Sequence, residues 1–217
     1  MKESKQSAVK RLLNTRGMGA VITAFAGLII IYIAFGIIDS NVFSGQNVMN
    51  LLRSMSKYLL IGVGQSYLLI TGNIDLSIGS MVGMSAMISA TLMTMGITPV
   101  VAMAVAMACC LLCGVVNGFL VGKFKLPPFI ATLGTMMITR GLGSIVTNTA
   151  TVTFPQASAP GGSFRGIFKL KGAGLPQAGI PTGFILLIVL AILMAILLNK
   201  ARPGRYILSL GSNKEAT

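Results

Sequence analysis

The sequence predicts an all-α fold: a polytopic bundle of transmembrane helices, with about six spans in this chain and both termini in the cytoplasm. Two observations carry this prediction. Of the 217 residues, 54% are hydrophobic and 10% are charged, whereas roughly a quarter of the residues in a soluble domain carry charge. The chain also alternates apolar runs, several of them about 20 residues long and able to cross a bilayer, with polar segments that hold most of the basic residues.

The predicted spans follow one another along the chain. The first, residues 18–38, is uncharged and longer than the apolar part of a signal peptide, which predicts a signal anchor. The second apolar run, residues 58–71, is short, so it spans only if its helix begins in the preceding amphipathic stretch, where Arg53 and Lys57 lie four apart on one face. The other predicted spans are residues 76–95, 99–121, 128–146 and 182–198.

The basic residues predict the orientation. Six crossings from a cytoplasmic start put eleven Lys and Arg inside and five outside, and leave Arg140 within the membrane, as the positive-inside rule requires. The chain is then a single transmembrane domain, 1–217, with a cytoplasmic tail at 1–17, an extracytoplasmic loop at 148–181 and a cytoplasmic segment at 199–217. The net charge of +13 is explained by this bias, so we expect a lipid bilayer as the partner and no nucleic acid.

The residues that enzymes use are scarce. The chain has no histidine and four acidic residues, and no phosphate-binding Gly-x-x-x-x-Gly-Lys-Ser/Thr motif occurs. Cys109, Cys110 and Cys113 lie in an apolar helix without further metal ligands, which favours a packing role. We therefore predict that the chain is not an enzyme, has no catalytic residue, holds no metal and binds no cofactor. If ATP drives its work, another chain hydrolyses it.

Residues 71–80 interrupt the apolar pattern. Gly72 and Asn73 suit a reversal that needs a positive φ. For Asp75 two roles stay open: an N-cap for the helix of the third span, or a functional group that pairs with a partner subunit or marks a hinge.

Polar residues within the spans leave a similar choice. Arg140 lies twelve residues beyond Pro128, about 18 Å into the helix. It is either a structural residue that binds neighbouring carbonyls and side chains or part of a substrate path. Gln65 and Asn117 pose the same choice, with a hydrogen bond between helices as the simpler role.

Glycines recur at steps of four in two of the predicted spans. This spacing lets membrane helices approach closely, so it predicts a packed bundle. The glycines are Gly79, Gly83, Gly114, Gly118 and Gly122.

Three motifs in order resemble one family. They are Leu-Ile-Thr-Gly-Asn-Ile-Asp-Leu-Ser-Ile-Gly-Ser at 69–80, Lys-Leu-Pro-Pro-Phe-Ile-Ala-Thr-Leu-Gly-Thr at 125–135 followed by Thr139-Arg140-Gly141, and Gly-Arg-Tyr at 204–206 leading to Gly-Ser-Asn-Lys-Glu-Ala at 211–216. Together they are similar to the bacterial ABC-transporter permeases of the ribose, galactose and xylose class. The resemblance covers nearly the whole chain from about Phe43.

The resemblance implies a multi-pass permease subunit in the bacterial cell membrane that imports a monosaccharide such as ribose, galactose or xylose. It implies three protein partners: a second permease subunit, an ATP-binding subunit that uses the ATP, and an extracytoplasmic sugar-binding protein. It makes residues 199–217 the segment that docks the ATPase. The residues concerned are Gly72, Asn73, Asp75, Ser77 and Gly79 in the signature, Gln65, Asn117 and Arg140 as candidates for the translocation path, and Gly204, Arg205, Tyr206, Gly211, Asn213 and Glu215 as candidates for ATPase coupling.

The sequence departs from the family in two places. Asn73 stands where the family usually has a second glycine, and the chain stops at Thr217, where the family continues. The second departure predicts a truncated chain, the N-terminal part of a longer family domain.

An ion-coupled secondary transporter of a small polar solute is the alternative. Arg140 within a span and the helix break at Asp75 favour it. The near absence of acidic residues in the spans argues against it.

Overall fold

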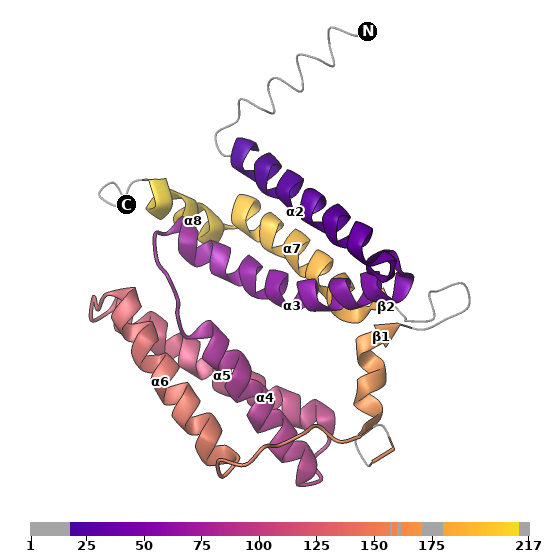
Figure 1. Ribbon diagram of the computed structural model, residues 1–217. Helices are drawn as coiled ribbons and strands as arrows, with labels where there is room; N and C mark the ends of the chain where they lie inside the picture. Colours follow the sequence, from indigo (N-terminus) through magenta and orange to yellow (C-terminus); the bar gives the residue numbers. More distant parts are fainter. Residues whose placement is uncertain (1–17, 157, 160–161, 171–179, 213–217) are drawn as a thin grey trace, which may run out of the picture. The chain divides into compact units, whose positions relative to one another are not determined.

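The computed structural model describes residues 18–156, 158–159, 162–170 and 180–212, and almost all of its regular structure is helical (Figure 1). The chain divides into two compact units, Met1–Leu51 and Leu52–Thr217, and each is described by itself. The elements are α2 (Met18–Ile38), η1 (Ser40–Phe43), α3 (Gly45–Ile70), α4 (Ile78–Thr94), α5 (Pro99–Gly122), α6 (Pro128–Val146), η2 (Gly162–Phe168), β1 (Lys169–Leu170), β2 (Ile180–Pro181), α7 (Thr182–Lys200) and α8 (Arg202–Ser212).

In the first unit, the short helix η1 folds back onto the end of α2. The Tyr32 hydroxyl donates a hydrogen bond to the Val42 carbonyl at 3.1 Å, and the Tyr32 and Phe43 rings meet edge to face with centroids 5.4 Å apart. Gly36 lies under the Phe43 ring, where an added Cβ would be 2.0 Å from a ring carbon. The absence of a side chain at Gly36 therefore permits the reversal.

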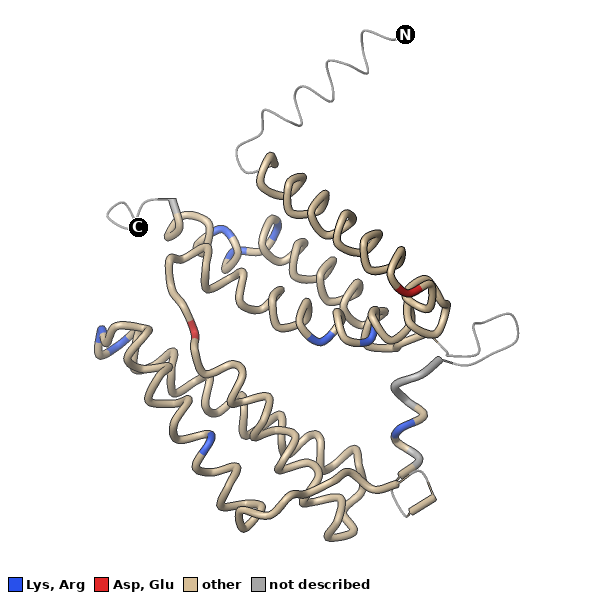
Figure 2. Tube along the Cα trace, viewed as in Figure 1, with Lys and Arg blue, Asp and Glu red and all other residues tan. Residues whose placement is uncertain are grey.

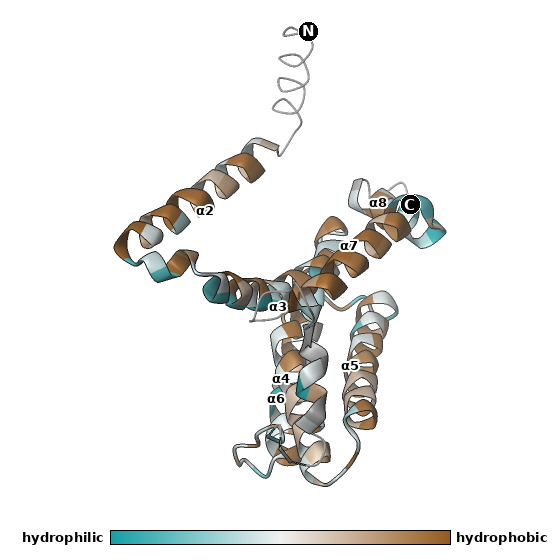
Figure 3. Cartoon of the chain, turned by 90° about the vertical axis from the view of Figure 1, so that its right-hand side faces the viewer, coloured by the Kyte–Doolittle hydropathy of each residue, from teal (hydrophilic) through white to brown (hydrophobic). Residues whose placement is uncertain are grey.

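Four helices, α2, α5, α6 and α7, are long and apolar enough to cross a membrane, and α4 is a shorter apolar helix of 17 residues. Figure 3 shows how strongly apolar α2 and α7 are, and most of their side chains are exposed. Exposed apolar surface of this kind suits lipid and not water. The helical, polytopic part of the prediction is thus confirmed. The second predicted span, residues 58–71, falls in the C-terminal part of α3, which continues unbroken from Gly45, and a total of six spans stays a prediction.

Helices α4, α5 and α6 pack against one another in the second unit. Proline begins two of them: Pro99 opens α5 and Pro128 opens α6, where the missing N–H costs nothing and the ring presets φ. The start of α6 at Pro128 is as predicted. Gly96, with φ +86°, allows the tight turn from α4 into α5.

The packed bundle that the glycine spacing predicted is present in α4, α5 and α6, but these glycines are not the positions where the helices approach closely. A Cβ added at Gly79, Gly83, Gly114, Gly118 or Gly122 would meet no described atom outside its own helix within 4 Å, so these glycines do not bring helices of this chain into close contact. The close approaches are at other glycines. A Cβ at Gly143 would lie 2.6 Å from the Met87 sulfur, and one at Gly183 would lie 3.3 Å from the Ser56 hydroxyl.

Two further elements contact the C-terminal part of α3. The Tyr67 hydroxyl donates to the Met194 carbonyl of α7. In α8, a Cβ at Gly211 would lie 2.2 Å from the Ile70 carbonyl oxygen, and one at Gly204 would lie 2.3 Å from the carbonyl oxygens of Leu197 and Leu198. At both glycines, the backbone of α8 therefore lies directly against the backbone of another helix.

The predicted outer loop contains some regular structure. Strand β1 pairs antiparallel with β2, and η2 places Phe164 in an apolar cluster with Met93 and Ala102 at the α4–α5 turn. The Arg165 side chain donates to the carbonyls of Pro155 at 2.8 Å and Phe154 at 3.0 Å. The described part of this loop is thus attached to the helices that it follows.

We predict that Gly211→Ala lowers the thermal unfolding midpoint of the detergent-solubilised chain. The added methyl group overlaps a backbone oxygen, which cannot rotate away, so the cost should be about 1–3 kcal/mol. Gly62→Ala is the matched control, because Gly62 lies in α3 and its added Cβ meets nothing within 4 Å. This control should be neutral or stabilise slightly through helix propensity. Equal midpoints for the two variants would refute the contact.

Candidate functional site

The break between α3 and α4 begins with a helix C-cap. Gly72 has φ +74°, its N–H bonds the Leu69 carbonyl at 3.0 Å, and the N–H of Asn73 bonds the Leu68 carbonyl at 2.9 Å. These two bonds form a Schellman motif, which satisfies the last carbonyls of α3. The predicted positive φ is confirmed at Gly72 and absent at Asn73, whose side chain instead donates to the Thr71 hydroxyl at 2.9 Å.

The prediction that Asp75 is the N-cap of the next helix is wrong. Helix α4 begins at Ile78 and its N-cap is Ser77, which makes no side-chain cap bond. Asp75 lies two residues earlier, and its Oδ1 accepts both the N–H of Ser77 at 2.7 Å and the Ser77 hydroxyl at 2.6 Å. A carboxylate bonding the backbone two residues ahead is an Asx turn. Asp75 therefore fixes the residue that starts α4 without capping the helix itself.

Ser77 also takes part in a series of side-chain hydrogen bonds that connects α5 and α6 to the start of α4. Asn117 of α5 donates from its side-chain nitrogen to the Ser77 hydroxyl at 3.3 Å, and its side-chain oxygen accepts from the Thr135 hydroxyl of α6 at 2.5 Å. Ser77, Asn117 and Thr135 are all buried. Asn117 thus has the predicted role of a hydrogen bond between helices.

On α6, this series of hydrogen bonds involves a row of buried threonines, which sequence reasoning did not select as site residues. Thr132, Thr135 and Thr139 are three and four residues apart, so they share one helical face. Thr132 and Thr139 donate to carbonyls one turn earlier at 2.8 Å. The Thr139 hydroxyl also lies 2.8 Å from that of Ser80 in α4. The sequence signal that could have identified these residues is the spacing of the three threonines, which puts their hydroxyls on one helical face.

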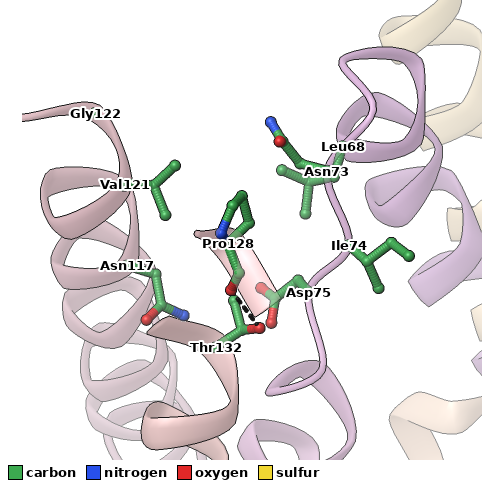
Figure 4. A pocket seen from close by; sticks show the side chains of 10 residues that line it. Leu68, Asn73, Ile74, Asp75, Asn117, Val121, Gly122, Pro128 and Thr132 are labelled. Carbon is green, nitrogen blue, oxygen red and sulfur yellow. Dashed lines mark hydrogen bonds between the residues drawn. The ribbon is translucent and has the colours of Figure 1, made fainter. Parts of the chain in front are cut away.

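A cavity of about 250 Å³ lies beside the break (Figure 4). We call it the Asp75 cavity. Asp75 and Asn73 line it from the break, Asn117 from α5 and Thr132 from α6, so the signature residues and two of the hydrogen-bonding helices meet there. The remaining lining is aliphatic or glycine: Leu68, Ile74, Gly118, Val121, Gly122 and Pro128.

A second cavity of about 420 Å³ lies between α4 and α6. We call it the Arg140 cavity. Arg140 lines it, and its exposed guanidinium makes no hydrogen bond or ion pair with any described residue. Gly79, Ser80, Gly83, Met84, Met87, Thr139 and Ser144 complete the lining. The predicted signature residue Gly79 and path residue Arg140 therefore meet here, while Asp75 belongs to the other cavity.

The remaining predicted site residues lie elsewhere. Gln65 lines neither cavity, and its buried side-chain oxygen has no hydrogen-bond partner among the described residues. In α8, Gly204 is buried in the corner with α7, and Arg205 and Tyr206 are exposed side by side with Arg202 around a small hollow. Asn213 and Glu215 lie outside the described residues.

Charged residues are sparse along the described chain (Figure 2), and its acidic residues are Asp39 in the first unit and Asp75 in the second. Among the described residues, no group of three His, Cys, Asp or Glu side chains is placed to hold a metal. The arrangement offers hydroxyl, amide and single charged groups around two hollows, which can bind and orient a polar solute.

Comparison with known proteins identifies relatives. The chain is 32% identical over 216 residues to the ribose import permease protein of Bacillus subtilis, covering 100% of this chain and 65% of that protein. It is 33% identical over 196 residues to the ribose import permease protein of Haemophilus influenzae, with coverages of 89% and 58%. The D-allose transport system permease protein of Escherichia coli is 31% identical over 191 residues, with coverages of 87% and 56%.

The chain spans less than two thirds of the length of these curated relatives. No solved structure matches it. Residues 47–217 match the family described as the permease component of the branched-chain amino acid transport system. This match includes the residues that line both cavities and the break, and three of the helices that are long and apolar enough to cross a membrane, α5, α6 and α7, lie within it. The chain belongs to this family of transport permeases.

Proposed function

We propose that the chain is the membrane-spanning permease subunit of an ATP-binding-cassette importer, which moves a monosaccharide such as ribose, galactose or xylose into the cell. The observation that carries the proposal is the combination of the family match with relatives whose names specify ribose and D-allose. The cavities support it, because hydroxyl, amide and charged groups beside aliphatic walls suit a sugar.

In this proposal the chain crosses the bilayer six times with both termini in the cytoplasm. The break at 71–77, the α5–α6 turn and α8 then lie on the cytoplasmic side, and residues 148–181 face outward. Lys123 and Lys125 in the α5–α6 turn and Arg202 and Arg205 in α8 supply the cytoplasmic positive charge. The contact of Gly211 with Ile70 supports placing α8 beside the break.

ATP is bound and hydrolysed by a partner subunit, and this chain binds no cofactor of its own. Helix α8, with exposed Arg205 and Tyr206, docks that subunit together with residues 213–217. A sugar-binding protein delivers the sugar to the outer face, and a second permease subunit completes the pathway in the membrane.

In this proposal, the break between α3 and α4 is the hinge of the conformational change. Residues 71–77 contain non-helical backbone between two helices, where rotation of a few dihedral angles reorients α4 relative to α3. Ser77, Asn117 and Thr135 tie the start of α4 to α5 and α6. A displacement of α3 therefore reaches the wall of the Arg140 cavity through α4 and α6.

The proposed transport is tested in proteoliposomes that hold the permease, the ATP-binding subunit and the sugar-binding protein. We expect uptake of labelled ribose, galactose or xylose that requires ATP hydrolysis and survives dissipation of ion gradients. Uptake by the permease alone, driven by an ion gradient, would instead establish an ion-coupled secondary transporter.

Substitutions in the two cavities should impair uptake to different degrees. Asp75→Ala removes two hydrogen bonds to Ser77 and should lower the initial uptake rate. Arg140→Ala should lower it more, because the guanidinium directly lines the proposed path. Wild-type rates in both variants, at equal amounts of assembled complex, would show that neither residue takes part.

Asn117→Ala should destabilise the helix bundle, because it leaves the Thr135 hydroxyl without its interhelical acceptor and Ser77 without a donor. We expect about 0.6–1.7 kcal/mol per lost bond in a membrane protein, measured as the free energy of unfolding in a detergent titration. In a double-mutant cycle, the variant that combines Asn117→Ala with Thr135→Val should lose less unfolding free energy than the sum of the losses in the two single variants.

Asn199→Ala is the control for this cycle, since Asn199 is exposed and its amide donates, among the described residues, to the Ala195 carbonyl of its own helix at 2.8 Å. Its effect should stay within about 0.5 kcal/mol. Additive effects of Asn117→Ala and Thr135→Val would mean that the two side chains do not interact.

A further inference from the structure

The two cavities carry charges of opposite sign. Among the described residues that line the two cavities, the ionisable one is Asp75 in the Asp75 cavity and Arg140 in the Arg140 cavity. Neither charge is neutralised by an opposite charge within its own cavity.

Both charges remain available to a solute. Oδ1 of Asp75 is occupied by the two bonds from Ser77, whereas its Oδ2 accepts no hydrogen bond from any described residue. The Arg140 guanidinium likewise has no partner among the described residues. A cavity with one uncompensated charge and partly apolar walls focuses that charge's field on whatever enters.

The cavities lie along one face of α6. Thr132 lines the Asp75 cavity and Thr139 lines the Arg140 cavity. Seven residues separate these threonines, which is close to two helical turns and about 10 Å. Each cavity therefore presents its own charged residue, negative in the Asp75 cavity and positive in the Arg140 cavity.

We propose that Asp75 and Arg140 form a two-sign charge filter, which limits the solute of the proposed importer to uncharged polyols. The inference rests on the proposed function. An anion such as a sugar phosphate is repelled at the Asp75 cavity, and a cation such as an amino sugar or K⁺ is repelled at the Arg140 cavity. A neutral sugar passes both, because each hydroxyl can donate to a carboxylate and accept from a guanidinium.

The filter is tested by ion leak through liposomes that contain the full 217-residue chain assembled with its second permease subunit, without ATP, the ATP-binding subunit or the sugar-binding protein. Asp75→Asn removes the negative charge but keeps an oxygen that can accept both bonds from Ser77, so chloride leak should rise about tenfold, equivalent to ~1.4 kcal/mol, while potassium leak stays unchanged. Arg140→Gln should raise potassium leak by a similar factor and leave chloride leak unchanged.

Two matched variants separate charge from shape. Arg140→Lys keeps the positive charge and should leak potassium no faster than wild type. Asp75→Ala removes the charge and the bonds to Ser77, and should leak chloride at least as fast as Asp75→Asn. The filter is overturned if neither charge-removing variant leaks, if both raise the two leaks equally, or if Asp75→Ala leaks while Asp75→Asn does not, since the last result would assign the barrier to the hydrogen bonds.

The same variants distinguish this inference from the proposed function. Ion selectivity is read on the two permease subunits without ATP, whereas ATP-dependent sugar uptake is read on the importer assembled with its ATP-binding subunit and sugar-binding protein. Sugar uptake with unselective leaks would overturn the filter and retain the importer. Opposite ion selectivities without ATP-dependent uptake of any sugar would support the filter and overturn the importer.

Discussion

The helix break depends on one constraint: the backbone N–H and carbonyl groups at its two helix ends need hydrogen-bond partners. Two helix ends meet at residues 71–77, and each end leaves N–H or carbonyl groups without intrahelical bonds. The positive φ of Gly72 satisfies the end of α3, and the Asp75 carboxylate holds Ser77 at the start of α4. The hydrogen bond from Asn117 depends on Ser77 being held there, and both Asn117 and Asp75 line the Asp75 cavity.

Sequence reasoning succeeded where local rules decide the structure. Pro99 and Pro128 begin helices because a proline fixes φ and lacks an N–H, and Gly72 reverses the chain because it alone tolerates a positive φ without strain. These effects involve a few adjacent residues. The apolar helices could be predicted for the same reason, since their length and composition are properties of each segment by itself.

It failed where the outcome depends on neighbours from other helices. Asp75 looked like an N-cap because it precedes an apolar run, but its carboxylate bonds Ser77 and the helix begins later. Gly79 and Gly118 looked like packing positions, but they line cavities. The spacing of the α6 threonines puts them on one helical face, but their hydrogen-bond partners, Asn117 and Ser80, lie on other helices and are known only from the structure.

The glycines of α8 leave its backbone in direct contact with two other helices, which makes these contacts stiff. At Gly204 and Gly211 the backbone of α8 lies directly against carbonyl oxygens of α7 and α3, with no side chain between. Side chains absorb small displacements by changing rotamer, whereas peptide groups have very little such compliance. A displacement of α8 at Gly211 would therefore act directly on the Ile70 peptide group, two residues before the Gly72 turn.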